Sequence, residues 1–107
     1  MVKIPSEVLE IIDTYIRLVR KDIKVKKVIL FGSYAKGKNN SESDIDIALI
    51  IEEYNENEFI SMGTFLLDRT EGLKVDLQPL PFSEDEYNNP KGIMEEIINT
   101  GIELKIA

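Results

Sequence analysis

One segment of the chain, FGSYAKGKNNSESDIDIAL at residues 31–49, carries most of the residue types that could do chemistry. Gly32 and Ser33 follow a short apolar run at residues 28–31, which is typical of a buried strand. Glycine lets the backbone turn sharply and approach a ligand closely. Ser33 can offer its amide and its hydroxyl to a phosphate oxygen, above all if it opens a helical turn. The pattern predicts a phosphate cradle, with an ordinary turn as the alternative.

Two carboxylates lie at the start of the next strand, which we expect over residues 45–51. Because side chains alternate along a strand, Asp44 and Asp46 share one face, while Ile45 and Ile47 point to the core. Two like charges on one face repel each other, and Mg²⁺ bound by their oxygens would offset that repulsion. The alternative is a solvated pair of acids. An EF-hand calcium loop is disfavoured because its glycine and its closing glutamate are absent.

A third acid, Asp76, lies in the run at residues 73–80, which we expect to form the third strand. Together with Asp44 and Asp46 it could share two metal ions, the arrangement used for in-line phosphoryl or nucleotidyl transfer. A single exposed acid is the alternative. The site needs Gly32–Ser33 at the end of one strand and Asp44 at the start of the next. We therefore expect these two strands to run antiparallel.

The composition of the 107 residues removes several other kinds of site. With no Cys there is no disulfide or thiolate nucleophile, and with no His there is no Ser-His-Asp triad or imidazole base. The G-x-G-x-x-G and Walker P-loop motifs are also absent. The formal net charge of −7 argues against nucleic acid as a ligand, because proteins that hold DNA or RNA usually show a basic face.

The chain length suits one domain over residues 1–107. No stretch approaches the roughly 20 apolar residues of a membrane span, and the start of the chain does not form a signal peptide. We therefore expect no membrane partner and a cytoplasmic location.

The expected elements follow the order helix, strand, polar loop, strand, helix, strand, helix, short strand. Apolar residues at helical spacing place the first helix at about residues 7–21 and the last near residues 90–100. A further helix should follow Asn55, which begins an Asx version of a capping box. Residues 102–106 alternate like a short edge strand. This order indicates a sheet covered by helices in one α/β or α+β domain.

Taken together, the motifs resemble the minimal nucleotidyltransferase domain of the DNA polymerase beta superfamily. The family pattern is G-S-x-A-[R/K]-G, a variable loop, S-D-x-D with a hydrophobic residue, and a third Asp on a later strand. Here it occupies residues 32–37, residues 43–47 and Asp76, so the resemblance covers nearly the whole chain. It implies a small mixed β-sheet flanked by helices. Lys36 stands where the family more often has Arg, and lysine keeps the charge but loses the bidentate fork.

The resemblance also implies two groups of site residues. Three carboxylates would hold two Mg²⁺ ions and carry out catalysis: Asp44, Asp46 and Asp76. Three residues of the turn would bind the triphosphate of ATP: Gly32, Ser33 and Lys36. The implied reaction is attack of an acceptor hydroxyl on the α-phosphate, with pyrophosphate leaving. Asp76 would take the acceptor's proton, directly or through its metal.

The acceptor is the least determined part of this interpretation. Stand-alone minimal members of the family resemble antitoxins paired with a small helical HEPN-type ribonuclease toxin, and the family activity there is AMP transfer from ATP to a Tyr of the toxin. We expect such a toxin as the partner, since a negative net charge suits a basic RNA-binding protein. Its docking surface should have an apolar centre, although most helical aromatics, Tyr15, Phe59 and Phe65, are expected in the core.

Two alternatives stay open for the function. One is an antitoxin module that inhibits its toxin sterically, with or without bound nucleotide. The other is a small-molecule nucleotidyltransferase of the aminoglycoside type, whose acceptor pocket would have to come from a homodimer.

Overall fold

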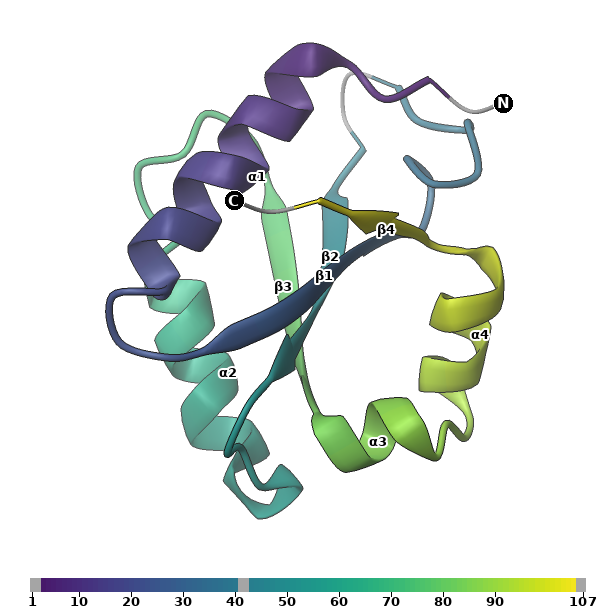
Figure 1. Cartoon of the computed structure of the whole chain (residues 1–107). Coiled ribbons are helices and arrows are strands. Elements are labelled where there is room, and N and C mark those ends of the chain that lie inside the picture. Colours follow the sequence, from purple (N-terminus) through teal and green to yellow (C-terminus); the bar gives the residue numbers. More distant parts are fainter. Residues whose placement is uncertain (1–2, 41–42, 106–107) are drawn as a thin grey trace.

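Four strands form one mixed sheet in the order β3–β2–β1–β4, in a computed structural model that describes residues 3–40 and 43–105 (Figure 1). β1 (Val25–Phe31) runs antiparallel to both its neighbours, β2 (Ile45–Ile51) and β4 (Ile102–Leu104). β2 runs parallel to β3 (Leu77–Ser83). The expected small mixed sheet is confirmed, and so is the antiparallel pairing of the first two strands.

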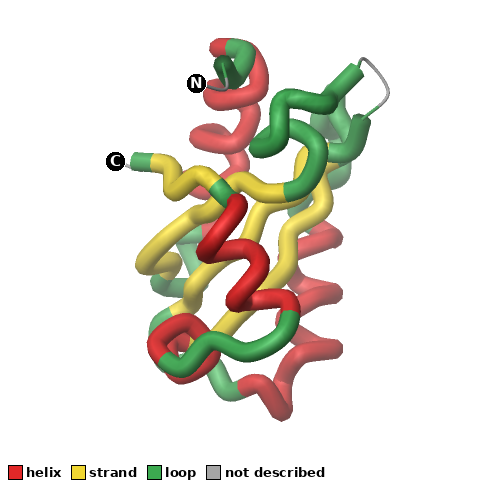
Figure 2. The backbone as a smooth tube through the Cα atoms, turned by 90° about the vertical axis from the view of Figure 1, so that its right-hand side faces the viewer, coloured by secondary structure: helices red, strands yellow, loops and turns green. Residues whose placement is uncertain are grey.

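Helices cover both faces of this sheet. α1 (Ser6–Val19) and α2 (Phe59–Asp68) pack on one face, and a short 3₁₀ helix, η1 (Glu56–Glu58), leads into α2. α3 (Glu84–Asn88) follows β3 directly, and α4 (Ile93–Thr100) lies over the strands on the opposite face (Figure 2). Among the described residues, no helix has the length and the apolar character needed to cross a membrane.

Alternation along β2 divides the core between the two faces. The odd positions from Ile45 to Ile51 are buried with α1 and α2, while Ala48 and Ile50 are buried with α4. Between the two helices on the first face, the Tyr15 hydroxyl donates a buried hydrogen bond of 2.7 Å to the carbonyl of Leu66. Tyr15 thereby satisfies one of the carbonyls near the end of α2 that lack a helical partner.

The third strand begins later than the sequence pattern predicts. We expected it over residues 73–80, but β3 begins at Leu77, so Asp76 precedes the strand. The alternation of apolar residues at 73 and 75 was misleading, because these side chains pack against the core from a bend. Pro79 and Pro81 do not end the strand, because β3 lies at the edge of the sheet and needs partners on one side only.

Helix boundaries also differ from the expected ones. α1 ends at Val19, where i→i−3 bonds from Lys21 and Asp22 close the last turn. α4 does not begin near residue 90, because Gly92 has a φ of +58° and interrupts the helical backbone. The sequence interpretation missed α3, and β4 ends at Leu104, with residue 106 outside the described residues.

The aromatic residues Tyr15, Phe59 and Phe65, which lie on helices, differ in how deeply they are buried. Tyr15 is in the core as expected and Phe65 packs against it, but Phe59 is 46% exposed. Phe59 occupies the first turn of α2. The expectation that most of these aromatics lie in the core is confirmed, and Phe59 is the exception.

Candidate functional site

The predicted acids meet at the amino ends of the two parallel strands. Ile45 pairs with Leu77, so the residues just before them, Asp44 and Asp76, lie side by side. The Ile45 amide also donates a 2.9 Å hydrogen bond to the Asp76 carbonyl. Asp46 lies opposite Gln78 in the same register. Since alternate residues share a face, these four polar side chains lie on one side of the sheet, the side that α4 covers further along.

The turn after β1 closes directly onto Asp46. Gly32 has a φ of +74°, in the left-handed region that favours glycine. A Cβ added at Gly32 would collide with Oδ2 of Asp46, so only glycine leaves room for this carboxylate. Register explains the contact, because Phe31, the last residue of β1, pairs with Asp46 across the antiparallel ladder. The predicted close approach of the glycine backbone is thus to a carboxylate, which it holds at the site.

Ser33 opens a single helical turn, as the sequence suggested. The amide of Lys36 donates to the Gly32 carbonyl at 3.2 Å, and that of Lys38 donates to the Ser33 carbonyl at 2.9 Å. Tyr34 and Ala35 point inward and are buried. One turn has only a small dipole, so anion binding here would rest on the amide and the hydroxyl of Ser33.

Lys36 contacts α4 instead of the acids. Its ammonium lies 4.0 Å from the carboxylate of Glu96, and its side chain is largely exposed. Because an exposed ion pair at this distance is weak, Lys36 can leave Glu96 for a stronger anion. Its role toward phosphate stays a prediction.

Crowding of the carboxylates shows in the pKa values of Asp44 and Asp46. Hydrogen bonding to Asp76, together with the negative charge of Asp76, raises the pKa of Asp44 above the ordinary value. Burial raises the pKa of Asp46, and the charges of Asp44 and Asp76 add to the shift. A bound cation would relieve this repulsion.

Gln78 is a site residue that the sequence interpretation missed. Its side-chain amide donates a 2.7 Å hydrogen bond to Oδ1 of Asp76, which fixes the orientation of that carboxylate. Its position two residues after Asp76 was the available signal, because residues i and i+2 of a strand share a face. The sequence interpretation passed over Gln78 because a neutral amide is not among the side chains expected to do the chemistry.

The donor set suits Mg²⁺, which prefers carboxylate oxygens. Within residues 3–40 and 43–105, however, no three acidic side chains are already arranged to enclose an ion. Asp44 lies close enough to Asp76 for hydrogen bonding and the charge of Asp76 to raise the pKa of Asp44. The residue types fit the metal, and side-chain movement would be needed for the three carboxylates to enclose it.

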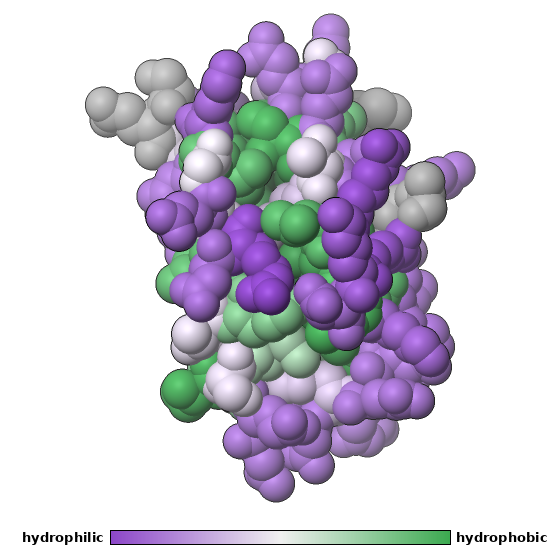
Figure 3. Space-filling model, turned by 90° about the vertical axis from the view of Figure 1, so that its left-hand side faces the viewer, coloured by the Kyte–Doolittle hydropathy of each residue, from purple (hydrophilic) through white to green (hydrophobic). Residues whose placement is uncertain are grey.

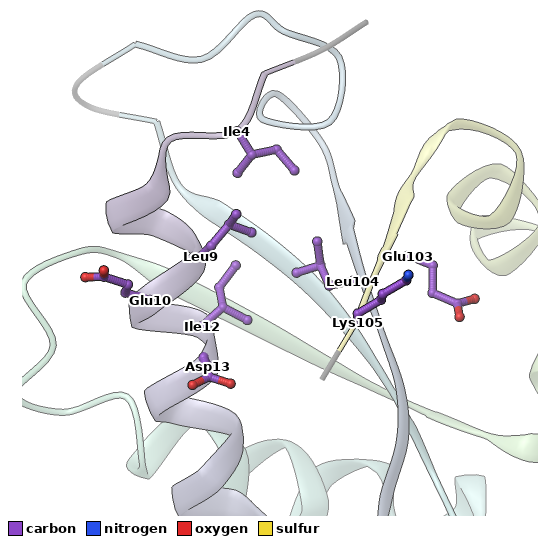
Figure 4. Close-up of a pocket in the computed structure, with 8 residues that line it drawn as sticks. All are labelled: Ile4, Leu9, Glu10, Ile12, Asp13, Glu103, Leu104 and Lys105. Atoms are coloured by element: carbon purple, nitrogen blue, oxygen red, sulfur yellow. The ribbon is translucent and has the colours of Figure 1, made fainter. Parts of the chain in front are cut away.

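A cavity of about 510 Å³ lies between α1 and β4, away from Asp44, Asp46 and Asp76 (Figure 4). Ile4, Leu9, Ile12 and Leu104 give it an apolar floor. None of the predicted site residues lines it. Because the predicted carboxylates and the Gly32 turn lie elsewhere, we assign no part of the site to it.

Comparison with protein families agrees with this geometry. Residues 13–106 match the family model described as polymerase beta, nucleotidyltransferase. The chain is a member of this nucleotidyltransferase family. Two proteins of Methanocaldococcus jannaschii, both described as inferred protein adenylyltransferases, are 38% identical over 101 residues and 33% identical over 97 residues. Each alignment covers 87% of this chain and 94% of the relative.

Solved structures show the same fold at lower identity. The crystal structure of an inferred nucleotidyltransferase from Sulfolobus solfataricus has a TM-score of 0.65 and 19% identity, covering 89% of this chain and 77% of the other. A toxin–antitoxin structure with AMP-PNP has a TM-score of 0.55 and 21% identity, covering 89% and 73%. A mutant toxin–antitoxin complex named MntA–HpeT has a TM-score of 0.53 and 22% identity, covering 88% and 71%.

Proposed function

We propose that this nucleotidyltransferase moves AMP from ATP to a hydroxyl of a partner protein, and that the partner is a small helical toxin of the HEPN type. The observation that carries the proposal is the site itself. Asp46 packs on the Gly32 turn while Asp44 and Asp76 contact each other at the adjoining strand ends. The turn at Gly32 and Ser33, which we propose binds phosphate, and the three carboxylates therefore lie at one end of the sheet.

In the proposed reaction, the acceptor oxygen forms a bond to the α-phosphorus, and the bond from that phosphorus to the bridging oxygen of the β-phosphate breaks. Pyrophosphate leaves, and the acceptor proton passes to Asp76. Gln78 holds Asp76 in place through its 2.7 Å hydrogen bond. Ser33 and the backbone at Gly32 position the triphosphate, and Lys36 adds charge. Magnesium held by the three carboxylates supplies charge neutralisation at the phosphate oxygens.

The nature of the acceptor is supported by the relatives. Those with 33–38% identity are described as protein adenylyltransferases, and two structural neighbours are toxin–antitoxin proteins, one of them with the ATP analogue AMP-PNP. AMP on a toxin Tyr would then neutralise the toxin, and this chain would act as the antitoxin.

One observation favours a second function, a module that inhibits its toxin by binding alone. No group of three acids within the described residues is arranged to hold an ion. A chain in which the three carboxylates never gather around a metal would bind its partner without turnover.

The experiment that separates the two functions uses ATP labelled on either the α- or the γ-phosphate. The chain is co-purified with the protein encoded beside it and incubated with Mg²⁺ and each nucleotide. We expect the α-label on the partner, no γ-label, and loss of labelling with Asp46→Asn. A complex that forms and inhibits the partner without labelling would support the binding module. Label on an aminoglycoside and on no protein would support the small-molecule function.

A further inference from the structure

The carboxyl ends of β2 and β3 carry a second concentration of acids, far along the strands from the candidate site. Because β2 and β3 are parallel, the segments that follow them, residues 52–58 and 84–86, meet at the same edge of the sheet. We call these two segments the acidic end. Its seven acidic side chains are Glu52, Glu53, Glu56, Glu58, Glu84, Asp85 and Glu86.

Two contacts show that the segments of the acidic end form one surface. The Ser83 hydroxyl donates a 2.8 Å hydrogen bond to Oε2 of Glu56, which joins the end of β3 to η1. A cavity of about 280 Å³ is lined from both segments, with Glu53 and Glu56 on one side and Asp85 on the other. The acidic end itself contains no Lys or Arg. Lys26 reaches it through a 3.5 Å contact with Glu84, and Lys24 and Lys91 line neighbouring cavities.

Tyr54 gives an observation that is independent of the charge at the acidic end. Its side chain is only 8% exposed and lies between two cavities of about 280 Å³ each. Among the described residues its buried hydroxyl has no hydrogen-bond partner. The carboxylates of Glu86, Glu56 and Glu58 surround it closely enough for their charges, after burial, to raise its pKa. A buried hydroxyl without a hydrogen-bond partner destabilises a folded protein. A bound partner could supply the missing hydrogen bond or move a neighbouring group so that it does.

Exposed apolar side chains adjoin the same surface. Phe59 and Ile60 follow Glu58 directly on the first turn of α2 and are 46% and 78% exposed. In Figure 3, hydrophilic residues cover the lower end of the molecule, where Figure 1 places the segment that leads into α2, and hydrophobic residues lie above them. A large aliphatic side chain this exposed beside a charged rim is typical of a protein-binding surface.

We propose that the acidic end, with Phe59 and Ile60, docks a basic amphipathic segment of another protein. Apolar side chains of that segment cover Phe59 and Ile60, and its Lys or Arg side chains contact the carboxylates around Tyr54. The charge selects this occupant. A second copy of the chain would place seven acids against seven, and nucleic acid or an anionic membrane would be repelled in the same way.

This proposal goes beyond the transfer reaction, because the acidic end lies at the opposite ends of β2 and β3 from Asp44 and Asp76. Docking holds the partner and transfer modifies it. Variants of the acidic end should therefore leave the site's own nucleotide binding unchanged. Failure of the docking proposal would leave the proposed transfer standing.

The test measures binding of defined peptides to the full ¹⁵N-labelled chain at physiological salt. The probe is a helix-forming peptide of about 18 residues with a Leu stripe flanked by Lys. One control peptide has Glu in place of Lys, and a second has the same composition with the Leu stripe dispersed. We expect the first peptide to shift the amide signals of residues 52–60 and 83–86, and neither control to do so.

Matched variants identify the surface. Glu56→Gln with Glu58→Gln, and separately Ile60→Ser, should each weaken peptide binding about tenfold, which corresponds to about 1.4 kcal/mol. Glu7→Gln with Glu95→Gln makes the same charge change elsewhere, and Leu18→Ser removes an exposed apolar side chain from α1. These control variants should bind like the wild type. All of these positions are exposed, and unchanged melting temperatures would confirm that each variant folds.

Four results would overturn the proposal. Equal weakening by the Glu7/Glu95 control, or equal binding of the dispersed peptide, would mean that only net charge is recognised. Signal shifts centred on residues outside the acidic end would place the peptide elsewhere. A concentration-dependent dimer that Ile60→Ser abolishes would assign this surface to a second copy of the chain.

Discussion

Replacing Gly32 by alanine tests the central contact of the site. Two effects combine at this position. The left-handed backbone, with φ of +74°, costs an alanine about 1–2 kcal/mol. The new Cβ also collides with the Asp46 carboxylate, and overpacking of this kind costs about 1–3 kcal/mol. We expect Gly32→Ala to destabilise the chain by about 2–5 kcal/mol from these two sources.

Gly72 supplies the matched control. Its φ is +89°, so alanine meets similar backbone strain, but a Cβ there has no atom within 4 Å. Gly72→Ala should therefore lose only the backbone part, about 1–2 kcal/mol. In a chain of this size about 1 kcal/mol lowers the melting temperature by roughly 4 °C. Thermal unfolding should separate the two variants by several degrees, and Gly32→Ala alone should lose AMP transfer.

A double variant isolates the collision. Asp46→Ala removes the carboxylate that Gly32→Ala would displace, so in this background Gly32→Ala should cost no more than Gly72→Ala does. Equal destabilisation by Gly32→Ala and Gly72→Ala in the wild-type background would refute the reasoning, because the contact between Gly32 and Asp46 would then have no energetic consequence.

Three further outcomes are expected. The folded chain holds the pKa of Asp46 above its ordinary value. The ionised carboxylate therefore destabilises the metal-free fold at neutral pH, and this cost disappears at low pH, where the group is protonated. Asp46→Asn should melt at a higher temperature than the wild type at pH 7, and the difference should close as the pH falls toward about 4. Tyr15→Phe should cost about 1–2 kcal/mol in denaturant unfolding, because the buried carbonyl of Leu66 loses its donor. Mg²⁺ with ATP should raise the melting temperature, and Ser33→Ala should reduce that rise while the exposed control Ser61→Ala leaves it unchanged.

The site was predictable from sequence where local geometry alone determines it. A strand with Asp44 and Asp46 must place both on one face, and a Gly-Ser turn after a buried strand must lie at its end. The antiparallel arrangement then followed from the need to bring the two together. The structure confirms the antiparallel arrangement, in which Phe31 pairs with Asp46.

The features that were missed depend on pairing or on capping. The start of β3 is set by its register with β2, which alternation at residues 73–80 cannot reveal. α3 could have been found, because Ser83 and Glu86 form a reciprocal capping box with two bonds of 3.0 Å. Gln78 becomes a site residue only when Asp46 is opposite it.

Side-chain positions were the least predictable part. The spacing of Lys36 after the turn does not reveal that its ammonium faces Glu96 on α4. The exposure of Phe59 likewise depends on where α2 begins relative to the end of the sheet. Both depend on packing between elements far apart in the chain.

The most direct test of the central claim is a crystal structure of the chain with Mg²⁺ and an ATP analogue that cannot transfer AMP. We predict metal ligation by Asp44, Asp46 and Asp76, with the triphosphate against Gly32 and Ser33. A nucleotide bound elsewhere, such as in the cavity between α1 and β4, or a metal without these carboxylates, would contradict the account.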